Sequence, residues 1–202
     1  MTLTTGFRAL LGLTVVLATP SIGRAQTAQR FSAQASGLFV TLAGDAYEAL
    51  DSGPGFEAQV RFNPGALSIG GGFQFSNHGI ATNTLDGSVR LIGPFLEPRY
   101  VIATQSPRFA PYVSSRLAVL RQSLNVEGFD GHANGLQING GGGVIVRLAS
   151  NVNVDLGATF GYIDFGKATL TNESTGITTE EPDSDSGTNW VIRIGFAFGL
   201  GR

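Results

Sequence analysis

Charged side chains recur at alternate positions within stretches that are otherwise apolar, a spacing that places them on one face of a β-strand. They are three carboxylates and five arginines: Glu57, Arg61, Glu97, Arg99, Arg116, Arg147, Asp155 and Arg193. Carboxylates and guanidinium groups form ion pairs, and a buried charge without a partner costs several kcal/mol. Glu57 and Glu97 are also a candidate acid–base pair. Because arginines share these faces, we expect salt bridging to be their role.

The sequence contains two histidines, His78 and His132, and both fall in segments that we expect to be loops. Ser76 lies two residues before His78, so a serine nucleophile with a histidine base is conceivable there. We interpret both histidines as loop residues and expect no catalytic residues.

Two further segments resemble ligand sites but lack the residues that define them. Gly140–Gly143 has the composition of a phosphate-binding loop, yet neither a helix nor a Lys-Ser/Thr pair follows it. Glycines within a strand instead indicate curvature or close backbone approach. Asp183–Gly187 resembles a calcium loop, but Ile194 stands where the loop's last glutamate belongs. We expect no cofactor and no metal site, and interpret the second segment as a solvated acidic loop.

Composition excludes several classes of function. The chain of 202 residues has no cysteine, which rules out disulfides and thiolate chemistry. Only Lys167 among the 13 basic residues is a lysine, and no basic run exists, so nucleic acid is not an expected partner. Glycine is abundant, with 29 residues, and only 14% of residues are charged.

The N-terminal segment Met1–Ala25 has the features of a secretory signal peptide. An arginine precedes the apolar stretch Ala9–Thr19, and small residues, Gly23 and Ala25, occupy the −3 and −1 positions of a cleavage site. The alternative is a membrane anchor, but eleven apolar residues are too few to span a bilayer as a helix. We therefore expect a signal peptide over residues 1–25 and one mature domain over residues 26–202.

Apolar and polar residues alternate through the mature chain, which predicts an all-β protein. The clearest strand is the last, where Trp190 and Ile192 begin a bulky face and Val191 and Arg193 begin a smaller, more polar one. Gly93-Pro94 predicts a bulge or a local disturbance in the fourth strand. The eight expected strands are Phe31–Ala43, Gly55–Asn63, Ala66–Ser76, Ser88–Ala103, Phe109–Gln122, Leu136–Leu148, Val152–Phe165 and Asn189–Leu200.

The connections between these strands alternate between long and short. The expected long, polar loops are Gly44–Gly53, Asn77–Gly87, Ser123–Gly135 and Gly166–Gly187. In an up-and-down arrangement all four lie at one end of the molecule, and both chain termini lie at the other. Membrane-spanning barrels have this asymmetry, with short periplasmic turns and longer extracellular loops.

On these features the chain resembles the small eight-stranded outer-membrane β-barrel family, which includes the transmembrane part of major outer-membrane proteins of Gram-negative bacteria. The resemblance covers Phe31–Arg202 and rests on the signal peptide, the strand pattern, the loop asymmetry and the aromatic last strand. It departs from the family at the end: Phe198 and Leu200 keep the alternation, but Arg202 replaces the aromatic residue that barrel-assembly machinery reads. The resemblance implies an antiparallel, porin-like transmembrane barrel in the outer membrane.

The resemblance also implies where the charged residues lie and what the protein contacts. Bulky faces would point to lipid and the charged faces into a lumen only wide enough for side chains, which predicts a polar plug. A narrow polar channel is the alternative reading of the same residues. The implied partners are outer-membrane lipid, lipopolysaccharide and the barrel-assembly machinery, and we expect a monomer.

Four functions remain open at this stage. The first is a non-enzymatic barrel that serves membrane integrity or surface interaction through its loops, and the second is a small-solute pore. The third is a lipid A-modifying enzyme, as some barrels of this family are. The His-x-Ser pair of the deacylase type fails here, because Ile80 and Asn134 stand two residues after the histidines. The fourth is a soluble secreted barrel whose bulky face points inward. We expect the first.

Overall fold

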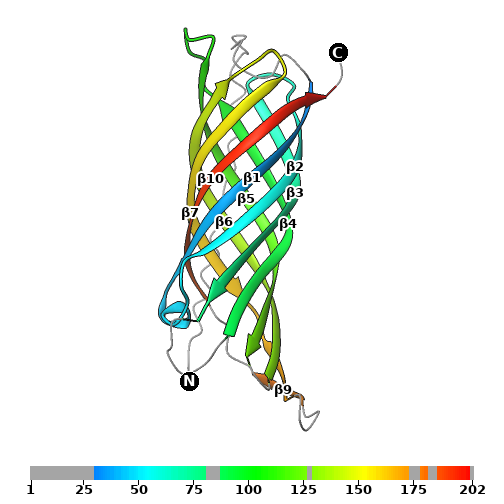
Figure 1. Cartoon of the computed structure of the whole chain (residues 1–202), viewed down its shortest axis with the longest axis vertical. Coiled ribbons are helices and arrows are strands. Elements are labelled where there is room, and N and C mark those ends of the chain that lie inside the picture. Colours follow the sequence, from blue (N-terminus) through cyan, green and yellow to red (C-terminus); the bar gives the residue numbers. More distant parts are fainter. Residues whose placement is uncertain (1–29, 81–86, 127–128, 173–177, 182–185, 201–202) are drawn as a thin grey trace, which may run out of the picture.

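The structure, a computed structural model, describes residues 30–80, 87–126, 129–172, 178–181 and 186–200 (Figure 1). The expected signal peptide and Arg202 lie outside these residues. Among the described residues, no helix is long and apolar enough to cross a membrane. The elements in chain order are β1 (Phe31–Ala43), the 3-10 turn η1 (Asp45–Tyr47), β2 (Gly53–Phe62), β3 (Leu67–Gly79), β4 (Gly87–Val101), β5 (Phe109–Val126), β6 (Phe129–Arg147), β7 (Val152–Phe165), β8 (Ala168–Asn172), β9 (Thr178–Glu181) and β10 (Ser186–Leu200).

Strands β1 to β7 and β10 form a closed antiparallel barrel of eight strands, tall and steeply wound in Figure 1. The barrel closes where β1 pairs with β10. The pairing covers the whole length of β1, from Phe31 opposite Leu200 to Ala43 opposite Thr188. A closed barrel exposes no strand edge along its wall. The expected eight-stranded antiparallel barrel is confirmed, and the bounds of β1 and β7 are those expected from the sequence.

The bulky faces of the strands point outward. On β10, Trp190 and Ile194 are 55% and 58% exposed, whereas Arg193 between them is 3% exposed. Aromatic rings pair across strands near both ends of the wall: the ring centroids of Phe31 and Phe62 are 5.2 Å apart, and those of Phe160 and Trp190 are 4.6 Å apart. An apolar outer band flanked by aromatic girdles is typical of barrels that span a membrane.

The segment Ser123–Gly135 is not a loop, and that expectation is wrong. β5 continues to Val126 and β6 starts at Phe129, so the two strands form one long hairpin. The residues of this segment are rich in glycine, asparagine and aspartate, which suggested a loop. Ser123–Val126 nevertheless pair with Phe129–His132 across the two strands, and Leu124 packs against the apolar residues of the lumen.

The segment between β7 and β10 contains a second hairpin, formed by β8 and β9. β8 takes over the pairing with β6 where β7 ends: Gly135 lies opposite Phe165, and His132 lies opposite Thr169. Three steps along β6 thus correspond to four along β7 and β8, which places a β-bulge at the junction. The hairpin extends the sheet beyond the barrel rim, where β9 is labelled in Figure 1.

Gly93-Pro94 produces no bulge. Ile92 lies opposite Arg121 and Phe95 opposite Ala118, so the same number of residues separates the pairs on both strands. Between them the ladder is interrupted, as expected where proline lacks an N–H. A Cβ on Gly93 would lie 1.9 Å from the carbonyl oxygen of Val119, so the backbones approach too closely there for a side chain.

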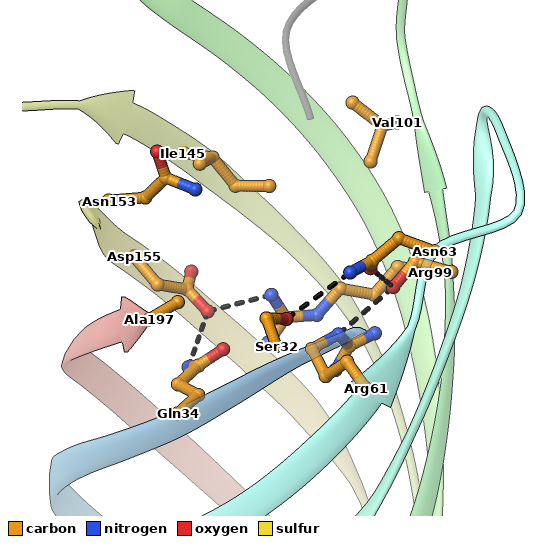
Figure 2. Close-up of a pocket in the computed structure, with 11 residues that line it drawn as sticks. Ser32, Gln34, Arg61, Asn63, Arg99, Val101, Ile145, Asn153, Asp155 and Ala197 are labelled. Carbon is orange, nitrogen blue, oxygen red and sulfur yellow. Dashed lines mark hydrogen bonds and ion pairs between the residues drawn. The ribbon is translucent and has the colours of Figure 1, made fainter. Parts of the chain in front are cut away.

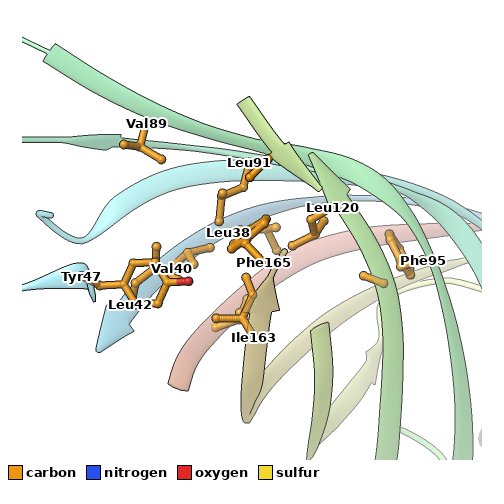
Figure 3. Packing of buried hydrophobic residues seen from close by; sticks show 13 residues of the cluster. Leu38, Val40, Leu42, Tyr47, Val89, Leu91, Phe95, Leu120, Ile163 and Phe165 are labelled. Carbon is orange, nitrogen blue, oxygen red and sulfur yellow. The ribbon is translucent and has the colours of Figure 1, made fainter. Parts of the chain in front are cut away.

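The lumen has a polar zone that holds the buried charges and a mainly apolar zone that also contains Ser76, His78 and Asn189, which corrects the expectation of a polar lumen throughout. The inward face of β1 shows the change: Ser32, Gln34 and Ser36 are followed by Leu38 and Val40. The polar zone lies toward the end where β1 begins, and the apolar zone toward η1. Figure 3 shows the apolar residues converging inside the wall. These are Leu38, Val40, Leu42, Tyr47, Val89, Leu91, Phe95, Ala118, Leu120, Ala133, Ile163, Phe165 and Val191.

Candidate functional site in the barrel lumen

Glu97 of β4 is the centre of the polar zone. Its carboxylate is fully buried and contacts four guanidinium groups that come from β2, β4, β5 and β10. The contacts are to Arg61 Nη1 at 3.3 Å, Arg193 Nη1 at 2.9 Å, Arg116 Nε at 2.7 Å and Arg99 Nε. Alternation along the four strands therefore directs four guanidinium groups at one carboxylate. A carboxylate can be buried this deeply only when such positive charges compensate its loss of hydration.

Two further carboxylates share these arginines. Glu57 of β2 lies 2.7 Å from Arg116 Nη1 and 3.3 Å from Arg193 Nη1. Asp155 of β7 lies 2.7 Å from Arg99 Nη1. The three carboxylates and four arginines are thus one connected cluster, which we call the lumen charge cluster.

Tyr112 and Gln34 complete the lumen charge cluster, although the sequence did not single them out. Tyr112 Oη and Gln34 Nε2 each donate a hydrogen bond of 2.7 Å to Asp155. Arg193 Nη2 in turn donates to Tyr112 Oη at 2.9 Å. For Gln34 a signal existed, because it shares an alternating polar face with Ser32 and Ser36.

Aromatic rings hold two of the guanidinium planes. Arg99 stacks over the ring of Tyr112 at 4.4 Å from the centroid, and Arg116 stacks over Phe95 at 4.0 Å. A guanidinium can stack and donate hydrogen bonds from its edge at once, which a lysine ammonium cannot. Because Phe95 belongs to the apolar residues, Arg116 also connects the two zones of the lumen.

Glycines in the wall make room for these side chains. A Cβ on Gly70 would lie 2.4 Å from Arg61 Nη1, and a Cβ on either Gly143 or Gly157 would lie 2.5 Å from Tyr112 Oη. The space inside an eight-stranded barrel is small, so large inward side chains need small neighbours. Gly143, the last residue of the Gly140–Gly143 segment, therefore serves packing in the lumen.

Seven of the eight charged residues singled out in the sequence meet in the lumen charge cluster: Glu57, Arg61, Glu97, Arg99, Arg116, Asp155 and Arg193. The eighth, Arg147, is half-buried at the end of β6, beside the turn that leads to β7. The arrangement joins carboxylates to guanidinium groups on every side, a geometry of mutual neutralisation. Glu57 and Glu97 have arginine partners and do not form an acid–base pair.

His78 lies on β3 and not in a loop, and it faces the lumen. Its Nε2 is 3.0 Å from Ser76 Oγ, and its Nδ1 is 3.0 Å from the backbone oxygen of Asp51. Nδ1 must donate to that carbonyl, so Nε2 accepts from the serine hydroxyl. The pair ties β3 to the connection that follows η1. His78 is fully buried and Ser76 is 5% exposed, which leaves a substrate no room to reach the hydroxyl. His132, on β6, is exposed.

The barrel is similar to several solved structures. Neisserial surface protein A aligns with a TM-score of 0.59 and 19% identity over 84% of this chain and 97% of that one. OprG of Pseudomonas aeruginosa aligns with a TM-score of 0.55 and 15% identity over 88% and 99% of the two chains. Ail, the attachment invasion locus protein of Yersinia pestis, gives 0.50 and 15% over 84% and 99%. No protein-family model matches the sequence, and no curated protein matches it.

These identities are low, so the likeness concerns the fold. It agrees with the closed wall, the outward apolar band and the inward charges seen in the structure. The chain has the fold of the small eight-stranded outer-membrane β-barrels.

Proposed function

We propose that this protein is a non-enzymatic outer-membrane barrel with a plugged lumen, which presents the β5–β6 and β8–β9 hairpins at the cell surface. The observation that carries the proposal is the filling of the lumen. A barrel filled with its own side chains leaves its outward-projecting segments as the parts able to engage a partner. Its role is then surface interaction or support of membrane integrity.

Both zones of the lumen support a plug. In the polar zone, the side chains of the seven ion-paired residues are at most 4% exposed. In the apolar zone, Leu120, Ile163 and Phe165 are at most 1% exposed. A conducting path for ions needs continuous water, and packed leucine and phenylalanine side chains exclude it. The plug therefore favours the surface role over the small-solute pore.

The surface role is supported by what projects from the barrel. The β8–β9 hairpin adds to β6 beyond the end of β7, at the same end as η1 and the β5–β6 hairpin (Figure 1). In barrels of this fold the end with longer connections faces the exterior. Two of the similar structures carry names that concern the surface or attachment: Neisserial surface protein A, and Ail, the attachment invasion locus protein.

Single cysteines test this orientation, because the natural sequence contains none. Thr179→Cys places a thiol on β9, and Ser150→Cys places one in the turn between β6 and β7. Both positions are exposed. In intact Gram-negative cells that express the chain, a membrane-impermeant maleimide should label Thr179→Cys. Ser150→Cys should react only after the outer membrane is permeabilised.

Electrophoretic mobility of each variant, unheated and boiled, reports whether the barrel has formed before labelling is compared. A closed barrel resists detergent and shifts in mobility on boiling. If intact cells label Ser150→Cys but not Thr179→Cys, the barrel has the opposite orientation, and the surface role of the hairpins is refuted. A protein that is soluble without detergent and shows no shift would refute the outer-membrane location itself.

A further inference from the structure

The lumen charge cluster contains more positive than negative charge. It joins four arginines, with a formal charge of +4, to three carboxylates, with a formal charge of −3, so the sum is +1. Its residues are almost completely buried. Burial of an excess charge is unfavourable unless a counter-charge accompanies it.

A small cavity adjoins the cluster near the end of the barrel where β1 begins. Its volume is about 30 Å³, and its walls include Ser32, Arg61, Asn63, Arg99, Asn153 and Asp155 (Figure 2). One water molecule needs roughly 10–15 Å³ of such volume. The cavity therefore has room for a water molecule or a monatomic ion, but not for a sugar or a phosphate ester.

Arg99 brings an unused donor to this cavity. Two of its three guanidinium nitrogens are engaged, Nε with Glu97 and Nη1 with Asp155. Its Nη2 is buried and has no hydrogen-bond partner in the protein, although the side chain is only 2% exposed. Arg99 thus lines the cavity and carries a donor nitrogen that no protein group uses.

Asn153 provides a second polar group on the cavity wall. Figure 2 shows its amide directed into the same space as Asp155 and Arg99. Asn153 is 3% exposed, and its Oδ1 has no hydrogen-bond partner among the described residues. An asparagine amide can present either its carbonyl or its NH₂ group, so it can donate to an anion in this position.

The surroundings of the cavity favour anions as well. Arg30, Arg108 and Arg147 lie at this end of the barrel. The acidic residues outside the lumen charge cluster whose side chains the structure describes all lie toward the opposite end: Asp45, Glu48, Asp51, Asp164 and Glu180. An excess of positive charge at one end of the barrel raises the local concentration of anions there.

We propose that this cavity binds a small monovalent anion, with chloride as its chemical type, against Nη2 of Arg99. The anion balances the excess charge of the lumen charge cluster and occupies the unused donor. The proposal rests on the lumen alone and is independent of the surface role of the hairpins.

Bromide tests the proposal directly, because it replaces chloride and scatters X-rays anomalously. Crystals of the mature barrel grown in sodium bromide should show an anomalous peak in the cavity, within hydrogen-bond distance of Arg99 Nη2. A cavity that shows water density without an anomalous peak would overturn the proposal.

A matched pair of variants then tests the electrostatic reason. Asn153→Asp places a carboxylate on the cavity wall and brings the cluster to neutrality, so the bromide peak should disappear. Asn151→Asp makes the same charge change in the exposed turn at the same end, and the peak should persist. A peak that survives in Asn153→Asp, or that is lost in both variants, would contradict a site set by this charge excess.

A solution measurement keeps the test valid if Asn153→Asp does not fold. The folded barrel gives its own gel band, which disappears when the sample is heated enough to unfold it. For the natural chain, this unfolding temperature should be higher in sodium chloride than in sodium gluconate at equal ionic strength. Gluconate is too large for the cavity. Equal temperatures in the two salts would count against anion binding, whatever the behaviour of the variants.

Discussion

Gly157 on β7 leaves the space that the hydroxyl of Tyr112 on β5 occupies. A Cβ built on Gly157 would lie 2.5 Å from Tyr112 Oη, and that oxygen bridges Asp155 and Arg193. The two strands are not neighbours in the wall, because β6 lies between them. A glycine thus determines whether a side chain from another strand can complete the lumen charge cluster.

Replacement of this glycine by alanine should destabilise the barrel. In Gly157→Ala the Tyr112 ring must move, with a cost of about 1–3 kcal/mol for overpacking. Urea unfolding of the barrel in lipid vesicles measures the change in free energy. Gly140→Ala is the matched control, because no atom lies within 4 Å of a Cβ at that position. Tyr112→Phe removes the crowded oxygen, so Gly157→Ala should cost less when it is introduced into the Tyr112→Phe variant than into the natural chain. Equal losses in Gly157→Ala and Gly140→Ala would refute the packing explanation.

Glu97→Gln should be strongly destabilising. It removes the anion that contacts four arginines and leaves them buried beside only two carboxylates. Breaking a buried ion pair from one side costs about 3–5 kcal/mol. The same unfolding measurement applied to Glu57→Gln provides the comparison. Glu57 contacts two arginines of the cluster, Arg116 and Arg193, and otherwise accepts hydrogen bonds from the neutral Ser36 and Gln59, so its loss should be smaller. The reverse order would contradict the central place of Glu97.

The barrel without substitutions should not conduct ions. In planar lipid bilayers, the purified barrel should produce no stepwise current, because the apolar and ion-paired side chains of both zones of the lumen are almost completely buried. A larger porin inserted under the same conditions verifies that the bilayer reports open channels. Reproducible unit steps that vanish on boiling the sample would support the small-solute pore in place of the plug.

Ser76 and His78 should have no catalytic role. Mass spectra of lipid A from cells that express the chain, its Ser76→Ala variant or no barrel should be the same, since both residues are buried in the lumen wall. The hydrogen bonds of His78 predict a structural effect instead. His78→Ala releases the connection that Asp51 belongs to and should speed proteolysis there. A lipid A mass change that requires Ser76 would establish the lipid-modifying enzyme.

The strands could be read from the sequence because lipid and lumen impose opposite demands on alternate residues. β1 and β7 have the expected ends, and the outward face of β10 is bulky from Trp190 to Leu200. The hairpin of β5 and β6 was missed because outside the apolar band neither face needs to be apolar. There Ser123 and His132 pair as strand residues, although the composition of their segment indicates a loop.

The candidate site could be read only in part. Alternation places Glu97 and Arg193 on inward faces, but their contact joins strands far apart in the chain and depends on barrel size and register. The change from Ser36 to Leu38 on one face of β1 was present in the sequence and marks the start of the apolar zone. The unused Nη2 of Arg99 depends on rotamers that no sequence pattern specifies.

Closure of the barrel through β1 and β10 has a consequence for the order of folding. Each of the other pairings in the wall joins strands that follow one another, or that flank the β8–β9 hairpin, whereas Phe31 and Leu200 lie at opposite ends of the described chain. The entropy cost of joining two points grows with the length of chain between them. Hairpins can therefore form early and locally, and we expect the β1–β10 seam to form last. β10 also closes the wall on both sides, so a chain interrupted before Ser186 can form hairpins but never a barrel.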